Sequence, residues 1–214
     1  MAIPTEITET WDFLHREVVW LHGRWSMYEQ LFGTSERRIQ ALNQVAPTFF
    51  GTLQTVLLDE VQLTLSRLGD PARSGRRSNL TLETLVEEIG KIPEPDLAAR
   101  LVVLLEEFRV TCEQIVLRRN RRIAHYDVST HRSAEGLAGA SREEVDRVLG
   151  ALRSFMTTVY AYYMNSHMAY ELFVLNDDAN HMVRAVAQAL RYRELIETGS
   201  IEEMDFVSSN HARI

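Results

Sequence analysis

Apolar residues recur at helical spacing along most of the chain, and the first stretch shows this most clearly. From about residue 5 to residue 32 the intervals alternate between four and three, which places the apolar side chains on one helix face, close to a heptad seam. The residues of this stripe are Ile7, Trp11, Leu14, Val18, Leu21, Trp25, Tyr28 and Phe32. Gly33 predicts the end of this helix, and Thr34 and Ser35 predict the N-cap of the next one.

The same periodicity predicts further helices, separated by short polar breaks. They lie at about residues 36–68, 81–90, 95–118, 141–163 and 179–197. Pro47 interrupts the first of these, so we expect a kink or a break there. Ser141 and Glu144 form a capping box, and the helix that they start is expected to pass through 165–170 with a bend.

These elements predict a single all-α domain over residues 1–214, built as an antiparallel helical bundle. No stretch sustains the two-residue alternation typical of a strand, and only 10 Gly and 5 Pro interrupt 214 residues. The polar segment 70–79 is predicted as a loop, and a polar tail begins at about residue 198. The wide apolar faces suggest that a partner subunit covers part of the surface, so we expect a dimer.

The chain is acidic, and its basic residues are almost all of one type. Thirty acidic residues against 23 basic ones give a net charge of −7, whereas a general nucleic-acid coat protein is usually basic. Every basic residue except Lys91 is an arginine. Arginine is the planar, multi-donor cation that suits phosphate contacts and ion pairs.

The expected compartment is the cytoplasm. Cys112 is the single cysteine, so no disulfide can form within the chain and a reducing environment is expected. The first residues have neither the basic start nor the apolar run of a secretory signal. No apolar run is long enough to span a bilayer, so we expect no membrane partner.

Common cofactor and metal motifs do not occur in the sequence. The phosphate-binding loops GxxxxGKS/T and GxGxxG are missing, and so are CxxC, HExxH and the ExxH pairs of bundle di-metal sites. Asp12 with His15, and Asp178 with His181, have an i,i+3 spacing, but each is an isolated pair. We therefore expect no metal site and no cofactor.

A dense basic cluster stands where the helix predicted at 95–118 runs out. The cluster consists of Arg118, Arg119, Asn120, Arg121, Arg122 and His125. Because the partial negative charge at a helix C-terminus repels phosphate, an anion site here would have to be built by these side chains. Two plainer interpretations stay open: the arginines bond the free carbonyls of the helix end, or they form a solvated face beside a buried His125.

The spacing of Arg119, Asn120 and His125 resembles the signature of the HEPN superfamily, an Arg with a polar residue after it and a His a few positions beyond. The stretch RNRRIAHYD is similar to the version found in abortive-infection HEPN proteins of the AbiU type. Looser similarity within about residues 10–165 lies at Ala46–Pro47, Phe49–Phe50, Asp59, Arg67–Asp70 and Asn79–Leu82.

The interval between Arg and His is not specific by itself. Arg16 and His22 are separated by a similar interval, with Glu17 after the Arg, and we expect this pair to be ordinary helix surface. Asn120 directly after Arg119 is what selects the second pair.

The resemblance implies a metal-independent endoribonuclease that acts in phage defence or as a toxin, with RNA as partner and an antitoxin or defence protein as a further one. His125 would act as general base or acid, since imidazole titrates near neutrality. Arg119 would bind the non-bridging phosphate oxygens, and Asn120 would orient the reacting groups. Flanking phosphates would be held by Arg118, Arg121 and Arg122. The products would be a 2′,3′-cyclic phosphate and a 5′-OH.

Helix geometry limits how such a site is assembled. Six residues at about 100° each leave Arg119 and His125 roughly 120° apart on an unbroken helix. Either the helix ends or bends near Asn120, or a second subunit completes the site, as the dimers typical of HEPN proteins imply. Two other functions stay open: a non-catalytic HEPN-like module that binds RNA, a nucleotide or a partner protein, and a structural protein whose arginines only form ion pairs.

Overall fold

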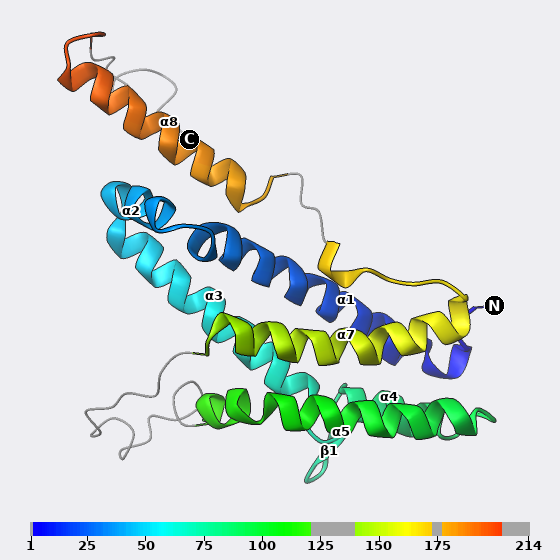
Figure 1. Ribbon diagram of the computed structural model, residues 1–214. Coiled ribbons are helices and arrows are strands. Elements are labelled where there is room, and N and C mark those ends of the chain that lie inside the picture. The colour runs from blue at the N-terminus through cyan, green and yellow to red at the C-terminus, as the bar shows by residue number, and fades with distance from the viewer. Residues whose placement is uncertain (1, 121–139, 173–176, 203–214) are drawn as a thin grey trace.

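The structure is a computed structural model and describes residues 2–120, 140–172 and 177–202 (Figure 1). The helices are α1 (Thr5–Tyr28), η1 (Glu29–Gly33), α2 (Glu36–Val45), α3 (Pro47–Leu68), α4 (Leu82–Ile89), α5 (Pro95–Arg118), α7 (Arg142–Met164), η3 (Tyr170–Leu172) and α8 (Ala179–Glu197). Two short strands, β1 (Arg73–Ser74) and β2 (Arg77–Ser78), form an antiparallel hairpin within the segment predicted as a loop. The predicted all-α helical bundle is confirmed.

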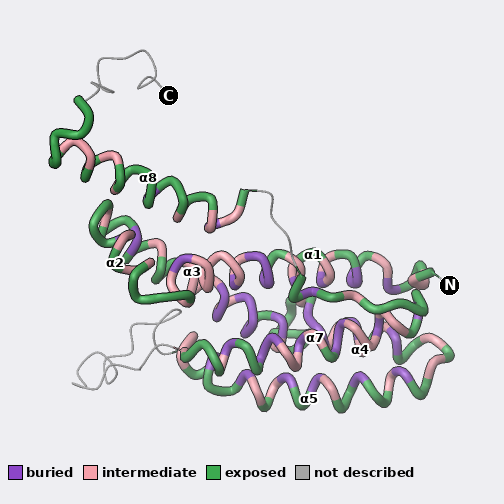
Figure 2. The backbone as a smooth tube through the Cα atoms, turned by 45° about the horizontal axis from the view of Figure 1, so that its top comes forward, coloured by how far each residue is buried: buried purple, intermediate pink, exposed green. Residues whose placement is uncertain are grey.

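One main core joins α1, α3, α4, α5 and α7. Most of the predicted α1 stripe is at most 4% exposed, namely Ile7, Trp11, Leu14, Val18, Leu21 and Trp25. The facing helices contribute Phe108 of α5 and Phe155 of α7, both fully buried. Buried turns recur along the inner side of each of these helices (Figure 2). Because a fully buried large apolar side chain stabilises the fold by about 1.5–3 kcal/mol, this seam holds the helices together.

Helices α5 and α7 lie side by side and run in opposite directions, so the end of α5 lies near the start of α7 (Figure 1). The hydroxyl of Ser141 caps α7 by accepting a hydrogen bond from the backbone N–H of Glu144 at 3.2 Å, which is one half of the predicted capping box. The other half does not form, because the Oε2 of Glu144 binds Arg118 and its Oε1 has no hydrogen-bond partner within the described residues. The antiparallel packing therefore places the start of the basic cluster at one end of a tightly packed helix pair.

The break between α2 and α3 follows from proline chemistry. Ala46 leaves the helical conformation at φ −154°, and Pro47 takes the first position of α3, where its missing N–H costs no hydrogen bond. At the other end, α3 stops at Gly69, which lies against the ring of Phe108. A Cβ at Gly69 would come within 3.0 Å of the Phe108 Cε1 atom, so the close approach of α3 and α5 favours glycine.

Helix α7 ends earlier than the sequence suggests. Asn165 adopts the left-handed conformation at φ 48° and ψ 40°, which stops the helix at Met164. The expectation that this helix passes through 165–170 was therefore wrong, because the apolar residues beyond Asn165 do not continue it. Tyr170 and Leu172 instead lie in the short turn η3, which folds back on α1.

A smaller apolar cluster joins η1, α2, the start of α3 and α8. Its buried residues are Leu31, Leu42, Phe50, Ala179 and Val186. Helix α8 has the bounds that the sequence predicts and packs on α2 and η1 (Figure 1). None of the helices in the described ranges combines the length and apolar composition needed to cross a bilayer. The single-domain organisation and the cytoplasmic location stay predictions.

Candidate active site

The motif residues Arg119 and Asn120 lie at the end of α5, where the helical backbone continues. Arg119 has φ −52° and ψ −51°, and the turn that includes Asn120 is of the wider π type. Turns of the π type are rare in proteins as a whole, and many of those that occur lie at functional sites. The α-helical part of α5 therefore ends at Arg118, and the chain enters the motif through a π turn rather than an extended loop.

Asp70, in the loop after α3, holds the Arg119 side chain in place. The Arg119 Nη1 donates to both carboxylate oxygens of Asp70 at 3.1 Å, and its Nε donates to the Oδ1 of Asn120 at 3.1 Å. The Arg119 side chain is 17% exposed and that of Asp70 is 34% exposed, so water screens the pair only in part. Nη2 of Arg119 makes no hydrogen bond to any described residue, which leaves one donor group for an anion.

Arg118 ties the end of α5 to the start of α7. Its Nη1 lies 2.7 Å from the Oε2 of Glu144, and the two side chains are 18% and 14% exposed. Glu144 lies in the first turn of α7, where the helix dipole favours a negative charge. A phosphate that binds Arg118 must therefore compete with a well-placed carboxylate.

The loop that carries Asp70 is itself fixed to α4 and α5. Arg109 donates from Nε to the carbonyl oxygen of Gly69 at 3.1 Å, and its Nη2 lies 3.0 Å from the Oε1 of Glu83. The other oxygen of Glu83 accepts the backbone N–H of Ala72 at 2.6 Å. This bond, helped by Arg109, holds the pKa of Glu83 below its ordinary value. Asp70 is thus positioned by its neighbours and does not depend on Arg119 alone.

Cys112 lies two turns before Arg119 on α5 and is 1% exposed. Burial raises the pKa of its thiol to about 12, so the sulfur is neutral at physiological pH. A neutral, buried thiol is a poor nucleophile, and Cys112 therefore contributes packing under the site and no chemistry.

The remaining predicted site residues, Arg121, Arg122 and His125, lie outside the described residues, and their roles stay predictions. Asp70 is a partner of the site that sequence reasoning missed. It stood only among the positions that carry the looser resemblance, with no role attached. A carboxylate directly after the helix stop at Gly69 was a local signal, but nothing local shows that it meets Arg119, 49 residues further along the chain.

The competing pair Arg16 and His22 does not form a second site. Arg16 is exposed, as expected, and lies 6.0 Å from the ring centroid of Phe13. His22 is only 5% exposed, so the expectation of ordinary helix surface was wrong for this residue. Its Nδ1 donates to the carbonyl oxygen of Val18 at 2.9 Å, so the buried imidazole has a hydrogen-bond partner within its own helix.

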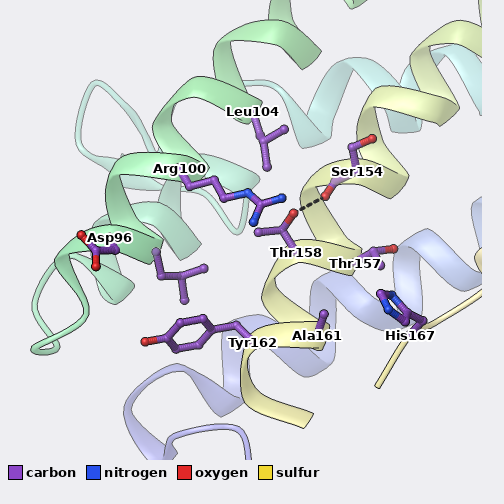
Figure 3. A pocket seen from close by; sticks show the side chains of 10 residues that line it. Asp96, Arg100, Leu104, Ser154, Thr157, Thr158, Ala161, Tyr162 and His167 are labelled. Carbon is purple, nitrogen blue, oxygen red and sulfur yellow. Dashed lines mark hydrogen bonds between the residues drawn. The ribbon is translucent and has the colours of Figure 1, made fainter. Parts of the chain in front are cut away.

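A groove of about 690 Å³ lies between α5 and α7, far from Arg119 (Figure 3). Arg100 reaches across it toward Thr158, and Leu104 lies beside them. Since 19 residues of helix span about 29 Å, Arg100 and Arg119 cannot share a ligand the size of one nucleotide. Within the described ranges no group of three or more His, Cys, Asp or Glu residues is placed to hold a metal ion.

Comparison with known protein families identifies one family that matches most of the chain. The AbiU2 model of the HEPN class matches residues 5–182. The chain belongs to the HEPN AbiU2 family. The match runs from the start of α1 into the first turn of α8, so it includes both Asp70 and the motif at the end of α5. No curated protein and no solved structure matches the chain significantly.

Membership in the AbiU2 family confirms the resemblance that the motif carries. It places the chain in the HEPN class and agrees with the helical fold. The remainder of α8 and the polar tail lie beyond the matched residues.

Proposed function

We propose that the chain is a metal-independent endoribonuclease that cleaves RNA to 2′,3′-cyclic phosphate and 5′-OH ends, in phage defence or as a toxin. The observation that carries this proposal is the Arg119 guanidinium, which Asp70 holds at the end of α5 while Nη2 makes no hydrogen bond within the described residues. A guanidinium that is already oriented stabilises the charge developing on a phosphate better than a mobile one, because it does not have to reorganise during the reaction. Family membership supports the HEPN class.

The reaction uses a nucleophile that RNA itself carries. A base takes the proton of the 2′-OH, the O2′–P bond forms, the P–O5′ bond breaks, and an acid gives a proton to the leaving 5′-oxygen. His125 performs one of these proton transfers, and Arg119 binds the non-bridging oxygens. Asn120 accepts a hydrogen bond from the Arg119 Nε and so fixes the plane of the guanidinium.

Phosphates on either side of the cleaved linkage bind Arg118, Arg121 and Arg122. Arg118 shares its charge with Glu144, so its contribution to RNA affinity is smaller than that of an unpaired arginine. Since each phosphate contact releases counterions, RNA binding weakens as the salt concentration rises.

A second copy of the chain completes the site. Helix α5 carries Val103, Val110 and Leu117 at intervals of seven residues, which places them on one helix face. They are 58%, 64% and 38% exposed, and exposed turns recur along one side of α5 (Figure 2). The stripe ends two residues before Arg119, so a twin α5 that packs near Leu117 brings both motifs into one cleft. We place this dimer in the cytoplasm, with an antitoxin or defence protein as its further partner.

The decisive experiment is an RNA cleavage assay in the presence of EDTA. Wild-type protein is incubated with total RNA and with defined RNAs, and the fragment ends are tested for 2′,3′-cyclic phosphate. We expect cleavage that EDTA does not reduce, and a loss of at least about 100-fold in His125→Ala, because general acid–base catalysis contributes roughly 10²–10⁴-fold.

The matched control is His167→Ala. His167 is exposed and lies beyond the end of α7, beside the groove of Figure 3, so its removal leaves the candidate site intact. Cleavage that persists in His125→Ala, with circular dichroism unchanged, contradicts the mechanism. Salt-sensitive RNA binding without cleavage favours the alternative function, a non-catalytic HEPN-like module that binds RNA.

A further inference from the structure

The hairpin of β1 and β2 concentrates positive charge on an acidic protein. It carries Arg73, Arg76 and Arg77, all exposed, and residues 71–82 contain no acidic side chain. Within the described residues none of these three arginines lies within 4 Å of a carboxylate. The hairpin projects from the bundle beside α5 (Figure 1). Its arginines are therefore free to attract an anion from solution.

The hairpin geometry spreads these charges over its two faces and its tip. Arg77 pairs with Ser74 across the strands, and Arg73 pairs with Ser78, so the two arginines lie on opposite faces. Gly75 has φ +62° at the first position of the two-residue turn, which suits a type II′ turn and puts Arg76 at the tip. Arg73 borders a shallow groove that also contains Glu83, Glu87 and Lys91, so carboxylates lie on its side of the hairpin, whereas Arg76 and Arg77 do not line this groove.

The base of the hairpin is held firmly. The side-chain amide of Asn79 donates to the carbonyl oxygen of Pro71 at 2.8 Å and to the Ser74 hydroxyl at 3.0 Å. The backbone N–H of Asn79 donates to the carbonyl oxygen of Ala72 at 2.8 Å, and Ala72 is 3% exposed. The arginines thus project from a fixed platform, which reduces the entropy lost when they bind a ligand.

The base of the hairpin follows closely in the chain on a residue of the candidate active site. Asp70, which binds Arg119, comes six residues before Arg76. Since consecutive Cα atoms are 3.8 Å apart, the Cα atoms of Asp70 and Arg76 are separated by at most about 23 Å. A polynucleotide at Arg119 extends over this distance within a few nucleotides.

The hairpin adds positive charge beside the two arginines of the site that the structure describes. Arg118 and Arg119 are partly neutralised by Glu144 and Asp70, so they attract a polyanion only weakly at long range. The net charge of −7 repels RNA from the rest of the surface. Unpaired arginines near the site therefore help Arg121 and Arg122 to hold the substrate against this repulsion.

We propose that the hairpin Arg73–Ser78 is an RNA-binding element that contacts backbone phosphates next to the Arg119 site. This inference rests on the proposed action on RNA and adds a binding surface separate from the motif. The ligand chemistry is the ribose–phosphate backbone, either of a single strand or of a stem.

The test compares two variants with the same change in net charge. The hairpin variant carries Arg73→Gln, Arg76→Gln and Arg77→Gln. The control carries Arg37→Gln, Arg184→Gln and Arg193→Gln, which are exposed arginines of α2 and α8. Both are made on His125→Ala, so that RNA binding is measured without cleavage. Fluorescence anisotropy with an unstructured oligonucleotide and with a stem-loop gives the Kd at several salt concentrations, in EDTA.

We expect the hairpin variant to bind RNA on the order of 10- to 100-fold more weakly near 0.15 M salt, with a log–log salt slope smaller by about 2. If the oligonucleotide loses more affinity than the stem-loop, the hairpin prefers single strands; the reverse shows a preference for stems. The control should change by no more than about threefold, and both variants should keep the circular dichroism spectrum and the Tm. Equal losses in the two variants, or no loss in the hairpin variant while the parent binds RNA, overturn the hairpin proposal and leave the proposed function standing. A wild-type chain that neither binds nor cleaves RNA overturns both.

Discussion

In the proposed mechanism, a single ion pair positions Arg119 for catalysis without using all of its donors. Asp70 occupies Nη1, Asn120 occupies Nε, and Nη2 has no partner in the part of the chain that the structure describes. The carboxylate that orients Arg119 also repels a phosphate that approaches it. Asp70 therefore favours reaction geometry at the expense of RNA affinity, and this conflict can be measured.

The variant Asp70→Asn separates these two effects. The amide keeps the shape of the side chain but loses its charge, so Arg119 is held less firmly while one repulsive charge disappears. We expect the cleavage rate at saturating RNA to fall by about tenfold or more, because positioning contributes to the chemical step. RNA affinity should stay equal or increase. Single-turnover kinetics together with Kd measurements test this; a Kd that rises with an unchanged rate assigns Asp70 to substrate binding instead.

The stability of Asp70→Asn is a second readout. A partly exposed ion pair contributes roughly 0.2–1 kcal/mol, so urea unfolding should show only a small loss. A loss of several kcal/mol contradicts a positioning role and means that Asp70 holds the loop together.

At the scale of elements, the turn η3 is fastened to α1 through two histidines. The Tyr170 hydroxyl lies 2.9 Å from the Nδ1 of His15, and the Tyr170 ring lies 5.8 Å from that of His22. The His22 Nε2 also lies 3.4 Å from the Nη1 of Arg153 on α7. The Nε of Arg153 in turn lies 3.8 Å from the Oε2 of Glu171 in η3. Because Nδ1 of His22 donates to Val18, Nε2 is the acceptor and His22 is neutral in this arrangement.

This arrangement predicts lower stability at mildly acidic pH. Burial lowers the pKa of both His15 and His22 from the ordinary value of 6.5. Between the lowered pKa and 6.5 the unfolded chain binds more protons than the folded chain, so the free energy of unfolding falls as the pH decreases through this window. Urea unfolding at pH 7.5 and 5.5 measures the fall.

The variant His22→Gln should flatten this pH dependence, whereas His167→Gln should leave it unchanged. Glu29, whose pKa is raised by burial, acts in the opposite direction, and it does so equally in the wild type and in both variants, so it does not affect their comparison. An equally steep pH dependence in His22→Gln contradicts the assignment to this cluster.

At the scale of the whole molecule, the proposed dimer follows from the exposed stripe on α5. A twofold contact along this stripe removes Val110 from water in both copies. We expect light scattering to give twice the mass of the 24.6-kDa chain. In Val110→Glu the dimer should dissociate about tenfold or more readily, because two carboxylates would lose water in an apolar contact.

The control for Val110→Glu is Val56→Glu on α3, since Val56 is exposed to a similar extent, 56% against 64%. This control should remain a dimer. A wild-type chain that is monomeric at every concentration, or equal effects of both substitutions, argues against an interface on α5.

The sequence alone determined the helical elements of this protein. The seam of α1, the break at Pro47, the N-cap at Ser141 and the bounds of α8 each depend on residues close together in the chain, and local spacing is enough to predict them. The one wrong boundary, at Asn165, arose because a left-handed residue stopped a helix whose apolar residues continue.

The sequence also determined the family, since Arg119, Asn120 and His125 form a local motif. Only the tertiary structure decided what Arg119 contacts, that His22 is buried, and that the arginines of the 70–79 segment project from a fixed hairpin. The physical reason is that helical periodicity fixes which face a residue occupies, whereas the partner on that face comes from another part of the chain. Asp70 and Arg119 meet because α3 and α5 pack closely at Gly69 and Phe108, a contact that no local pattern contains.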